Sequence, residues 1–132
     1  MIFTEDELEY LATQRLGRIA TQQPDGTLQV SPVGFRYNAE TETVDVYGHG
    51  MAESRKYRNV ADNGRVAFVV DDIATTRPWR PRCVEIRGRA EATTGENGAP
   101  MIRITPERII SFGLQGLDVP AYELPMNSRK VG

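Results

Sequence analysis

The stretch RIATQQPDGTLQVSPVGF, residues 18–35, decides the fold because it encodes two strands and the tight turn between them. In the turn Pro24-Asp25-Gly26, proline sets φ at the first position and glycine supplies a positive φ. Strands are predicted on either side, over residues 17–22 and 27–37. Pro32 cannot donate to a ladder and marks an edge or a bulge in the second strand. This stretch therefore predicts an antiparallel hairpin.

The rest of the chain is predicted to consist of further strands and two short helices. Thr4-Glu5-Asp6-Glu7 forms a capping box that begins the first helix, and residues 52–62 form the second, which Asn63-Gly64 ends. Period-two alternation and short apolar runs predict strands from Val44 to Tyr47 or His49 and over residues 65–70, 82–93 and 101–105. Residues 71–81 are expected to form a loop rich in Arg and Pro, residues 106–112 a helix or turn, and the tail after Gly116 irregular structure.

Strands dominate this order of elements and follow one another as antiparallel meanders. A barrel is the natural closure, because it removes exposed strand edges. With no internal repeat and no linker, residues 1–132 are predicted to form one mainly β domain with short helices at its ends. The apolar run through Val66, Phe68 and Val70, together with Trp79, indicates more apolar surface than one small barrel covers, so a homodimer is expected.

Composition excludes several classes of protein. No apolar run approaches the ~20 residues that span a membrane, and the acidic start MIFTEDELEY lacks a signal-peptide pattern. The single cysteine, Cys83, excludes an internal disulfide framework. We therefore expect a cytoplasmic protein that has no membrane contact. A net charge of −2, without basic residues interleaved among aromatics, also argues against nucleic acid as a partner.

Charge is distributed unevenly along the chain. Residues 1–54 carry three basic and nine acidic side chains, a net of −6, whereas residues 55–89 carry nine basic and four acidic ones, a net of +5. The middle of the chain is therefore a candidate anion-binding region. The alternative is that these arginines are solvated partners of the acidic first third.

No set of residues typical of side-chain catalysis stands out. The chain has one histidine, His49, which lies between two glycines and is interpreted as a loop residue. Cys83 lies in an alternating strand and is interpreted as a small, half-buried residue. No cluster of metal ligands, no Ser-His-Asp arrangement and no GxGxxG or Walker loop is present. An enzyme with this sequence would depend on a bound cofactor for its chemistry.

Ser54-Arg55-Lys56 is the sharpest local signal for a ligand. It lies near the start of the second predicted helix, where cations oppose the helix dipole at a cost of ~0.3–1 kcal/mol each. An anion at the helix N-terminus would reverse that cost, with free amides, the Ser54 hydroxyl and the two cations converging on a phosphate. The alternative is a solvated basic turn.

Residues 16–89 resemble the pyridoxamine 5′-phosphate oxidase-like split barrels. The resemblance depends on the order and spacing of three runs: RIATQQPDGTLQVSPVGF, VDVYGHGMAESRKYRNVADNGRVAFVV and PRCVEIRGRAEA. The VSPVGF strand and the segment ERIISFGL, residues 107–114, resemble a small actinobacterial branch that uses the deazaflavin coenzyme F420. The resemblance implies a split β-barrel homodimer with the cofactor in a groove between subunits.

The resemblance also implies roles for individual residues. Arg55 and Lys56 match the phosphate-binding pair of the family, and Tyr47 and Gly48 match its pair near the ring and the tail. Cys83 stands where flavin-binding oxidases carry a glutamine that bonds the ring. That departure, with the lack of the C-terminal segment that holds pyridoxal phosphate, argues against a true pyridoxamine phosphate oxidase. The strand expected to run along the ring, with backbone contacts, comprises Val30, Ser31, Pro32, Val33 and Gly34 and continues to Arg36.

The expected loop from Arg77 to Arg82 adds a second possible contact with the cofactor. Arginine forks, Arg80 among them, suit the carboxylates of the deazaflavin's polyglutamate tail. Trp79 would close one side of the ring pocket. The alternative is a rigid exposed loop whose tryptophan fills the dimer interface.

The sequence therefore predicts an oxidoreductase that uses F420 for hydride transfer to or from a small organic substrate. One alternative is an FMN-binding oxidoreductase of the same fold. The other is a flavin- or deazaflavin-binding protein without turnover. No side chain is predicted to be catalytic.

Overall fold

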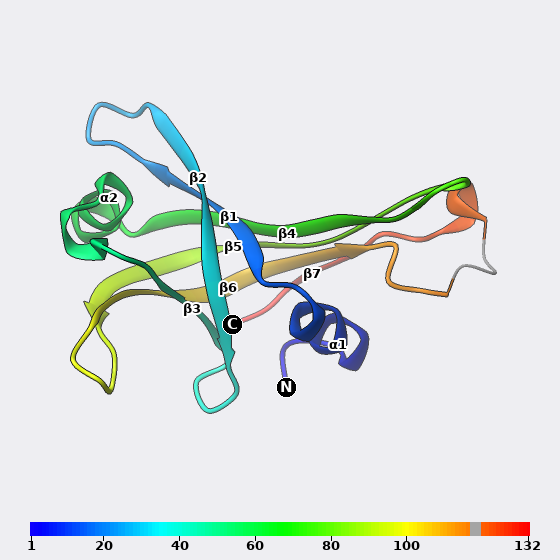
Figure 1. The fold of residues 1–132 in the computed structure, drawn as a ribbon, viewed down its shortest axis with the longest axis horizontal. Coiled ribbons are helices and arrows are strands. Elements are labelled where there is room, and N and C mark those ends of the chain that lie inside the picture. Colours follow the sequence, from blue (N-terminus) through cyan, green and yellow to red (C-terminus); the bar gives the residue numbers. More distant parts are fainter. Residues whose placement is uncertain (117–119) are drawn as a thin grey trace.

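An antiparallel sheet in the order β3–β2–β1–β4–β5–β6–β7 makes up most of the protein (Figure 1). The structure is a computed structural model that describes residues 1–116 and 120–132. A further pairing between β3 and β6 joins the two sides of the sheet, so that six strands close into a barrel. The strands are β1 (Leu16–Gln22), β2 (Leu28–Asn38), β3 (Thr43–Tyr47), β4 (Arg65–Thr76), β5 (Trp79–Thr94), β6 (Pro100–Phe112) and β7 (Asn127–Lys130).

The predicted hairpin is confirmed as β1 and β2, which pair from Leu16↔Gly34 to Gln22↔Leu28. Its period-two pattern places alternate residues in the barrel, where Ile19 is 1% exposed. Phe68 of β4 lies across β1 at Gly17, where an added Cβ would come within 2.3 Å of the phenyl ring. The same ring meets Phe35 edge-on, with centroids 5.5 Å apart. Glycine at position 17 therefore allows the Phe68 ring to pack directly against the backbone of β1.

Both predicted helices are present. In α1 (Glu5–Thr13) the capping box is confirmed, with Thr4 Oγ1 accepting from the Glu7 amide at 3.1 Å. Helix α2 (Arg55–Asn63) ends at Gly64, whose φ of 69° is left-handed. The helix starts three residues later than expected, because Ser54 is extended and separates it from a short 3₁₀ turn, η1 (Met51–Glu53). No helix in the described residues is long and apolar enough to cross a membrane.

The prediction of a loop over residues 71–81 is wrong. Strand β4 continues to Thr76 and β5 begins at Trp79, so the two form a long hairpin that projects beyond the barrel (Figure 1, right). The polar residues that obscured the pattern are paired with one another. Asp72 lies opposite Arg82 in the ladder and binds it at 2.6 Å. Cross-strand ion pairs thus take the place of apolar alternation in this part of the sheet.

The helix or turn expected over residues 106–112 is also wrong. Strand β6 continues to Phe112 past a bulge, because Gly88 pairs with Pro106 and Arg87 with Arg108, leaving Glu107 without a partner in β5. Pro106 cannot donate a ladder hydrogen bond, and the bulge accommodates it. Glycine at position 88 is required by the close approach, since an added Cβ would lie 2.1 Å from Thr105 O.

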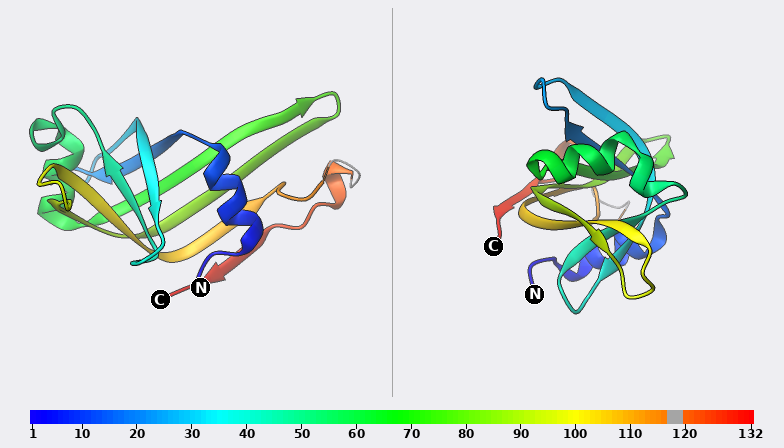
Figure 2. Two further views of the ribbon diagram at one scale, coloured as in Figure 1. Left: turned by 60° about the horizontal axis from the view of Figure 1, so that its bottom comes forward. Right: turned by 90° about the vertical axis from the view of Figure 1, so that its left-hand side faces the viewer.

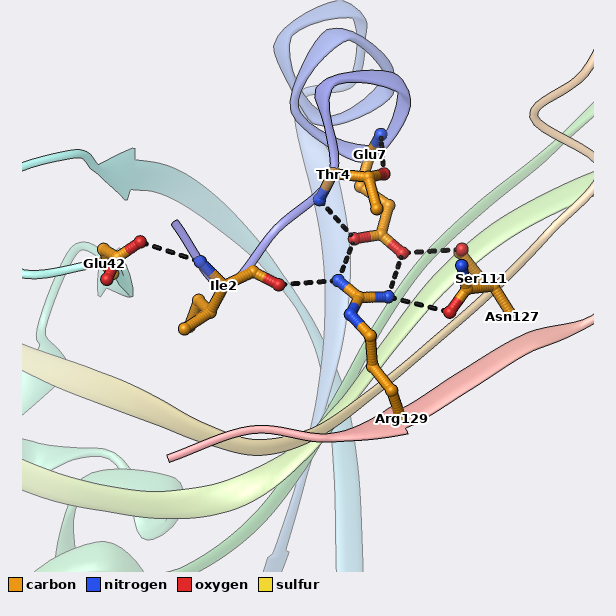
Figure 3. Close-up of polar contacts among 7 residues, drawn as sticks. All are labelled: Ile2, Thr4, Glu7, Glu42, Ser111, Asn127 and Arg129. Atoms are coloured by element: carbon orange, nitrogen blue, oxygen red, sulfur yellow. Dashed lines mark hydrogen bonds and ion pairs between the residues drawn. The ribbon is translucent and has the colours of Figure 1, made fainter.

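The tail expected to be irregular contains a short helical turn, η2 (Ala121–Glu123), and strand β7, which pairs with β6. Residues 117–119 of that tail lie outside the described residues. A partly buried ion pair fixes β7 to α1 (Figure 3). The Glu7 side chain is 0% exposed and accepts from Arg129 at 2.6 and 2.9 Å and from Ser111 Oγ at 2.6 Å. Arg129 also donates to Ile2 O at 2.6 Å, so one guanidinium holds the helix, the segment that precedes it and β7 together.

Replacing Glu7 with glutamine should lower the free energy of unfolding at pH 7 by about 2–3 kcal/mol, because it leaves Arg129 partly buried without its counter-charge. Urea unfolding followed by circular dichroism measures the change. Glu9→Gln, on the exposed side of the same helix, is the matched control and should change stability by about 0.5 kcal/mol or less.

The same pair of proteins tests the charge state of Glu7. Burial raises the pKa of its carboxyl, but hydrogen bonds from Arg129 and Ser111 outweigh that effect, so the pKa lies below the ordinary 4.5. The stabilisation is therefore present above about pH 4.5 and is lost as the pH falls through the lower value of the folded state. The difference between wild type and Glu7→Gln should shrink in that acid range, and a constant difference there would contradict the assignment.

Candidate cofactor-binding site

The start of α2 presents two adjacent cations. Arg55 is exposed and Lys56 half-buried, and neither forms an ion pair with any described residue. The first turn contains no acidic residue. Ser54 is the N-cap: its Oγ accepts from the Tyr57 amide at 3.3 Å and donates to Met51 O at 2.6 Å. The hydroxyl thus orders the helix start, and the two side-chain cations remain available to an anion.

The turn between β1 and β2 lies close to these cations. Hydrogen bonds from the Thr27 hydroxyl and amide hold the pKa of Asp25 below its ordinary value, and the charge of Arg55 acts in the same direction. Asp25 is an exposed acid near the basic pair that sequence reasoning did not assign to the site. Its only signal was the turn motif itself, which was interpreted as structural.

Strand β2 presents alternate residues to the two sides of the sheet. Val30, Pro32 and Gly34 are exposed on the outer side, whereas Val33 points into the core and is 6% exposed. Ser31 Oγ is shielded from solvent and has no hydrogen-bond partner in the described part of the chain. The five predicted residues therefore cannot all face one ring, and the outer three offer the contact surface.

Val30, on the outer side of β2, borders a shallow groove of about 300 Å³. Its floor is apolar, formed by small and β-branched side chains of β1, β2 and β4, and its rim carries one charge of each sign. The lining residues are Arg18, Ala20, Val30, Ala67, Phe68, Val69 and Glu85. An apolar floor with few polar groups suits a flat ring.

Tyr47 and Gly48 lie at the end of β3, beside β2. Tyr47 is opposite Gly34 in the ladder, so the two predicted groups are neighbours. Tyr47 also lines a polar hollow of about 420 Å³ with Arg36, Asp45 and Arg103. Asp45 is 4% exposed and is bound by Arg103 at 3.1 Å, which leaves Arg36 as the unpaired cation of these four. The structure thus groups β2, the end of β3 and the start of α2 at one end of the barrel (Figure 2).

Within one chain, the predicted residues around the β4–β5 turn lie far from β2, the end of β3 and the start of α2. The turn lies at the opposite end of the long axis from α2 (Figures 1 and 2). Trp79 begins β5 there and is 58% exposed. Arg80 is only 1% exposed and donates to Gly116 O at 2.9 Å, so the expectation that it offers a surface fork to a polycarboxylate tail is wrong. Because β5 begins at Trp79, successive side chains alternate in direction and Arg80 points inward.

Cys83 lies between the two ends, on β5 opposite Asp71. Burial raises the pKa of its thiol, and the neighbouring carboxylates of Glu85 and Asp71 raise it further. The thiol is therefore a weak hydrogen-bond partner and a poor nucleophile at neutral pH. In the described residues, no group of three or more potential metal ligands comes together.

A family model described as pyridoxamine 5′-phosphate oxidase matches residues 3–111 of the chain. The protein belongs to this family. Its sequence is 44% identical over 123 residues, 88% of this chain and 87% of the relative, to a 5a,11a-dehydrotetracycline/5a,11a-dehydrooxytetracycline reductase from Streptomyces rimosus. The predicted split-barrel fold is confirmed by solved structures of other members of this fold.

Two solved structures illustrate the likeness. A conserved hypothetical protein from Mycobacterium tuberculosis superposes with a TM-score of 0.72 at 20% identity, covering 91% of each chain. An FAD-binding protein from Mycobacterium smegmatis superposes with a TM-score of 0.64 at 21% identity, covering 83% of this chain and 93% of that one. At such identities the likeness concerns the fold alone.

Lys56→Glu should weaken binding of a phosphate-bearing flavin or deazaflavin at least about a hundredfold, equal to ~2.7 kcal/mol, because it removes a charge-assisted bond and adds repulsion. Fluorescence titration with F420 and with FMN measures the loss. Lys130→Glu, at the exposed lysine of β7, is the matched control and should bind as wild type does. Equal affinity of Lys56→Glu and wild type would place the phosphate elsewhere.

Proposed function

We propose that this protein is an oxidoreductase that reduces a small organic molecule with coenzyme F420. The observation that carries the proposal is the pair of adjacent cations at the start of α2, neither of which forms an ion pair in the described residues, in a chain that is 44% identical to a reductase. A helix N-terminus with two cations suits a phosphate, and the apolar groove on the outer face of β1, β2 and β4 suits a flat ring. The residues present therefore fit a phosphate-bearing ring cofactor, which when bound would supply the hydride.

The roles of the protein's own residues follow from their places. Arg55 and Lys56 hold the phosphate, with the first amides of α2. The backbone of β2 runs along the ring, with Val30 and Pro32 against its face. Ser31, whose side chain lies on the other side of the sheet, contributes its backbone alone to this contact. The apolar floor excludes water from the face where the substrate would lie.

Two features of the sequence favour F420 over FMN. Cys83 replaces the glutamine that bonds the flavin ring in oxidases of the family, and the order of segments resembles the deazaflavin branch. The arginines of residues 77–82 support F420 less than the sequence indicated, since Arg80 is buried and Arg82 is bound to Asp72. Arg77 remains exposed at the turn. FMN is therefore the second candidate, and a binding protein without turnover is the third.

A homodimer forms part of the proposal. Phe68 and Val70 face the barrel's own core at 1% and 0% exposure, so they do not contribute to an interface as the sequence pattern had indicated. Other apolar residues are exposed and could form the interface: Leu28 is 76%, Val30 68% and Trp79 58% exposed. A second copy would cover these residues and bring its own β4–β5 turn to the groove beside β2, which one chain cannot do.

Steady-state turnover tests the activity. Reduced F420 should support reduction of 5a,11a-dehydrotetracycline, the compound named for the Streptomyces relative, and Lys56→Glu should slow it through a raised KM for the cofactor. Absence of turnover with either reduced F420 or reduced FMN, despite tight binding of one of them, would favour the binding protein.

Cofactor preference is tested separately. F420 should bind more tightly than FMN in parallel titrations at low and moderate salt. Shortening the polyglutamate tail should weaken binding modestly and make it less sensitive to salt, because exposed charge pairs are screened. FMN binding at least about tenfold tighter than F420 at both salt concentrations would contradict the F420 assignment.

Sedimentation at micromolar concentration tests the dimer. A species of twice the chain mass of 14.7 kDa is expected. Val30→Glu should shift the equilibrium toward the monomer, because it places a charge in the covered apolar face. An unchanged thermal midpoint in the monomeric state would show that the fold is intact. A wild-type monomer would contradict the proposal.

A further inference from the structure

Two arginines lie directly opposite each other at the end of the sheet next to α2. Arg65 is the first residue of β4 and pairs in register with Arg89 of β5. Both side chains are exposed. They border an open groove of about 350 Å³ whose other lining residues are Val66, Arg87, Gly88 and Glu107.

Neither guanidinium is neutralised within the described residues. The Arg65 and Arg89 guanidinium groups form no ion pair or hydrogen bond there, although the Arg65 backbone amide donates to Asn63 Oδ1 at 3.0 Å; Arg87, by contrast, is bound by Glu85 at 2.7 Å. Glu107, the bulge residue, is the acid in the groove, and its carboxylate forms no ion pair in the described part of the chain. The groove therefore holds two unpaired cations and one unpaired anion.

Like charges directly opposite each other in a ladder destabilise the sheet. The carboxyl end of α2 at Gly64 favours one nearby cation through the helix dipole, which accounts for Arg65. It does not account for a second arginine placed across from the first. Glu107 offsets at most one of the two charges, so the groove keeps a net positive charge. Such a break of a local rule is typical of a binding site.

We propose that Arg65 and Arg89 form a binding site for an oxyanion, the phosphate or carboxylate group of a small molecule. Two guanidinium forks on neighbouring strands can each donate two parallel hydrogen bonds to one such group, which converts their repulsion into attraction. The site is distinct from the cations at Arg55 and Lys56. Neither Arg55 nor Lys56 lines the groove, and the nine residues of α2 separate them from Arg65.

Calorimetric titration at constant ionic strength tests the site with two probes, inorganic phosphate and a glutamate tripeptide. The titrations use protein that carries Arg55→Gln and Lys56→Gln, so that binding at the start of α2 does not contribute. Adding Arg65→Gln and Arg89→Gln should weaken binding of the preferred probe by at least about tenfold. Arg15→Gln, at an exposed arginine outside the groove, is the matched control and should leave the affinity unchanged.

Thermal unfolding in chloride provides the second readout. Because the substitutions remove repulsion, the Arg65→Gln, Arg89→Gln protein should melt at the same temperature as its parent or higher. Tighter binding of phosphate would show that the site prefers a phosphoryl group. Tighter binding of the tripeptide would show that it prefers a polycarboxylate. Equal affinities of parent and variant for both probes, or a lower melting temperature of the variant in chloride, would overturn the proposal.

Discussion

The pairing of β3 with β6 is the contact on which the rest of the structure depends. It joins strands more than fifty residues apart in sequence and converts an open sheet into a barrel. Val44, Val46, Ile102 and Ile104 are each 0% exposed, so the closure lies inside the core. Asp45 and Arg103, opposite each other in the same ladder, add a bidentate ion pair at its edge. Without this closure β3 would be an exposed edge strand.

Local rules predicted the elements whose signals are local. The Pro24-Asp25-Gly26 turn, the capping box at Thr4 and the glycine after α2 each depend on a few neighbouring residues, and each was predicted correctly. The failures share a different cause. Asp72 and Arg82 looked like loop residues because each satisfies the other only across the ladder. Pro106 looked like the start of a helix, but a bulge that Gly88 of another strand permits keeps it in β6.

In the candidate site, too, the residues with local sequence signals were predicted and those that depend on strand register were not. The cations at the start of α2 were predicted from sequence, because helix starts and their capping residues are adjacent in the chain. The direction of each side chain could not be predicted where the strand boundaries were wrong. Arg80 became buried once β5 began at Trp79, and Arg65 and Arg89 became neighbours only through the register of β4 and β5. Charge counts had pointed to this region without separating paired arginines from unpaired ones.

The Glu7–Arg129 ion pair links residues that are 122 positions apart. At synthesis rates of ~5–20 residues per second, roughly 6–24 s pass between the making of the acid and the making of its partner. During that interval α1 can form as a helix, but its carboxylate has no counter-charge with which to enter the core. The N-terminal helix, first to be made, is therefore among the last parts of the protein to reach its final place.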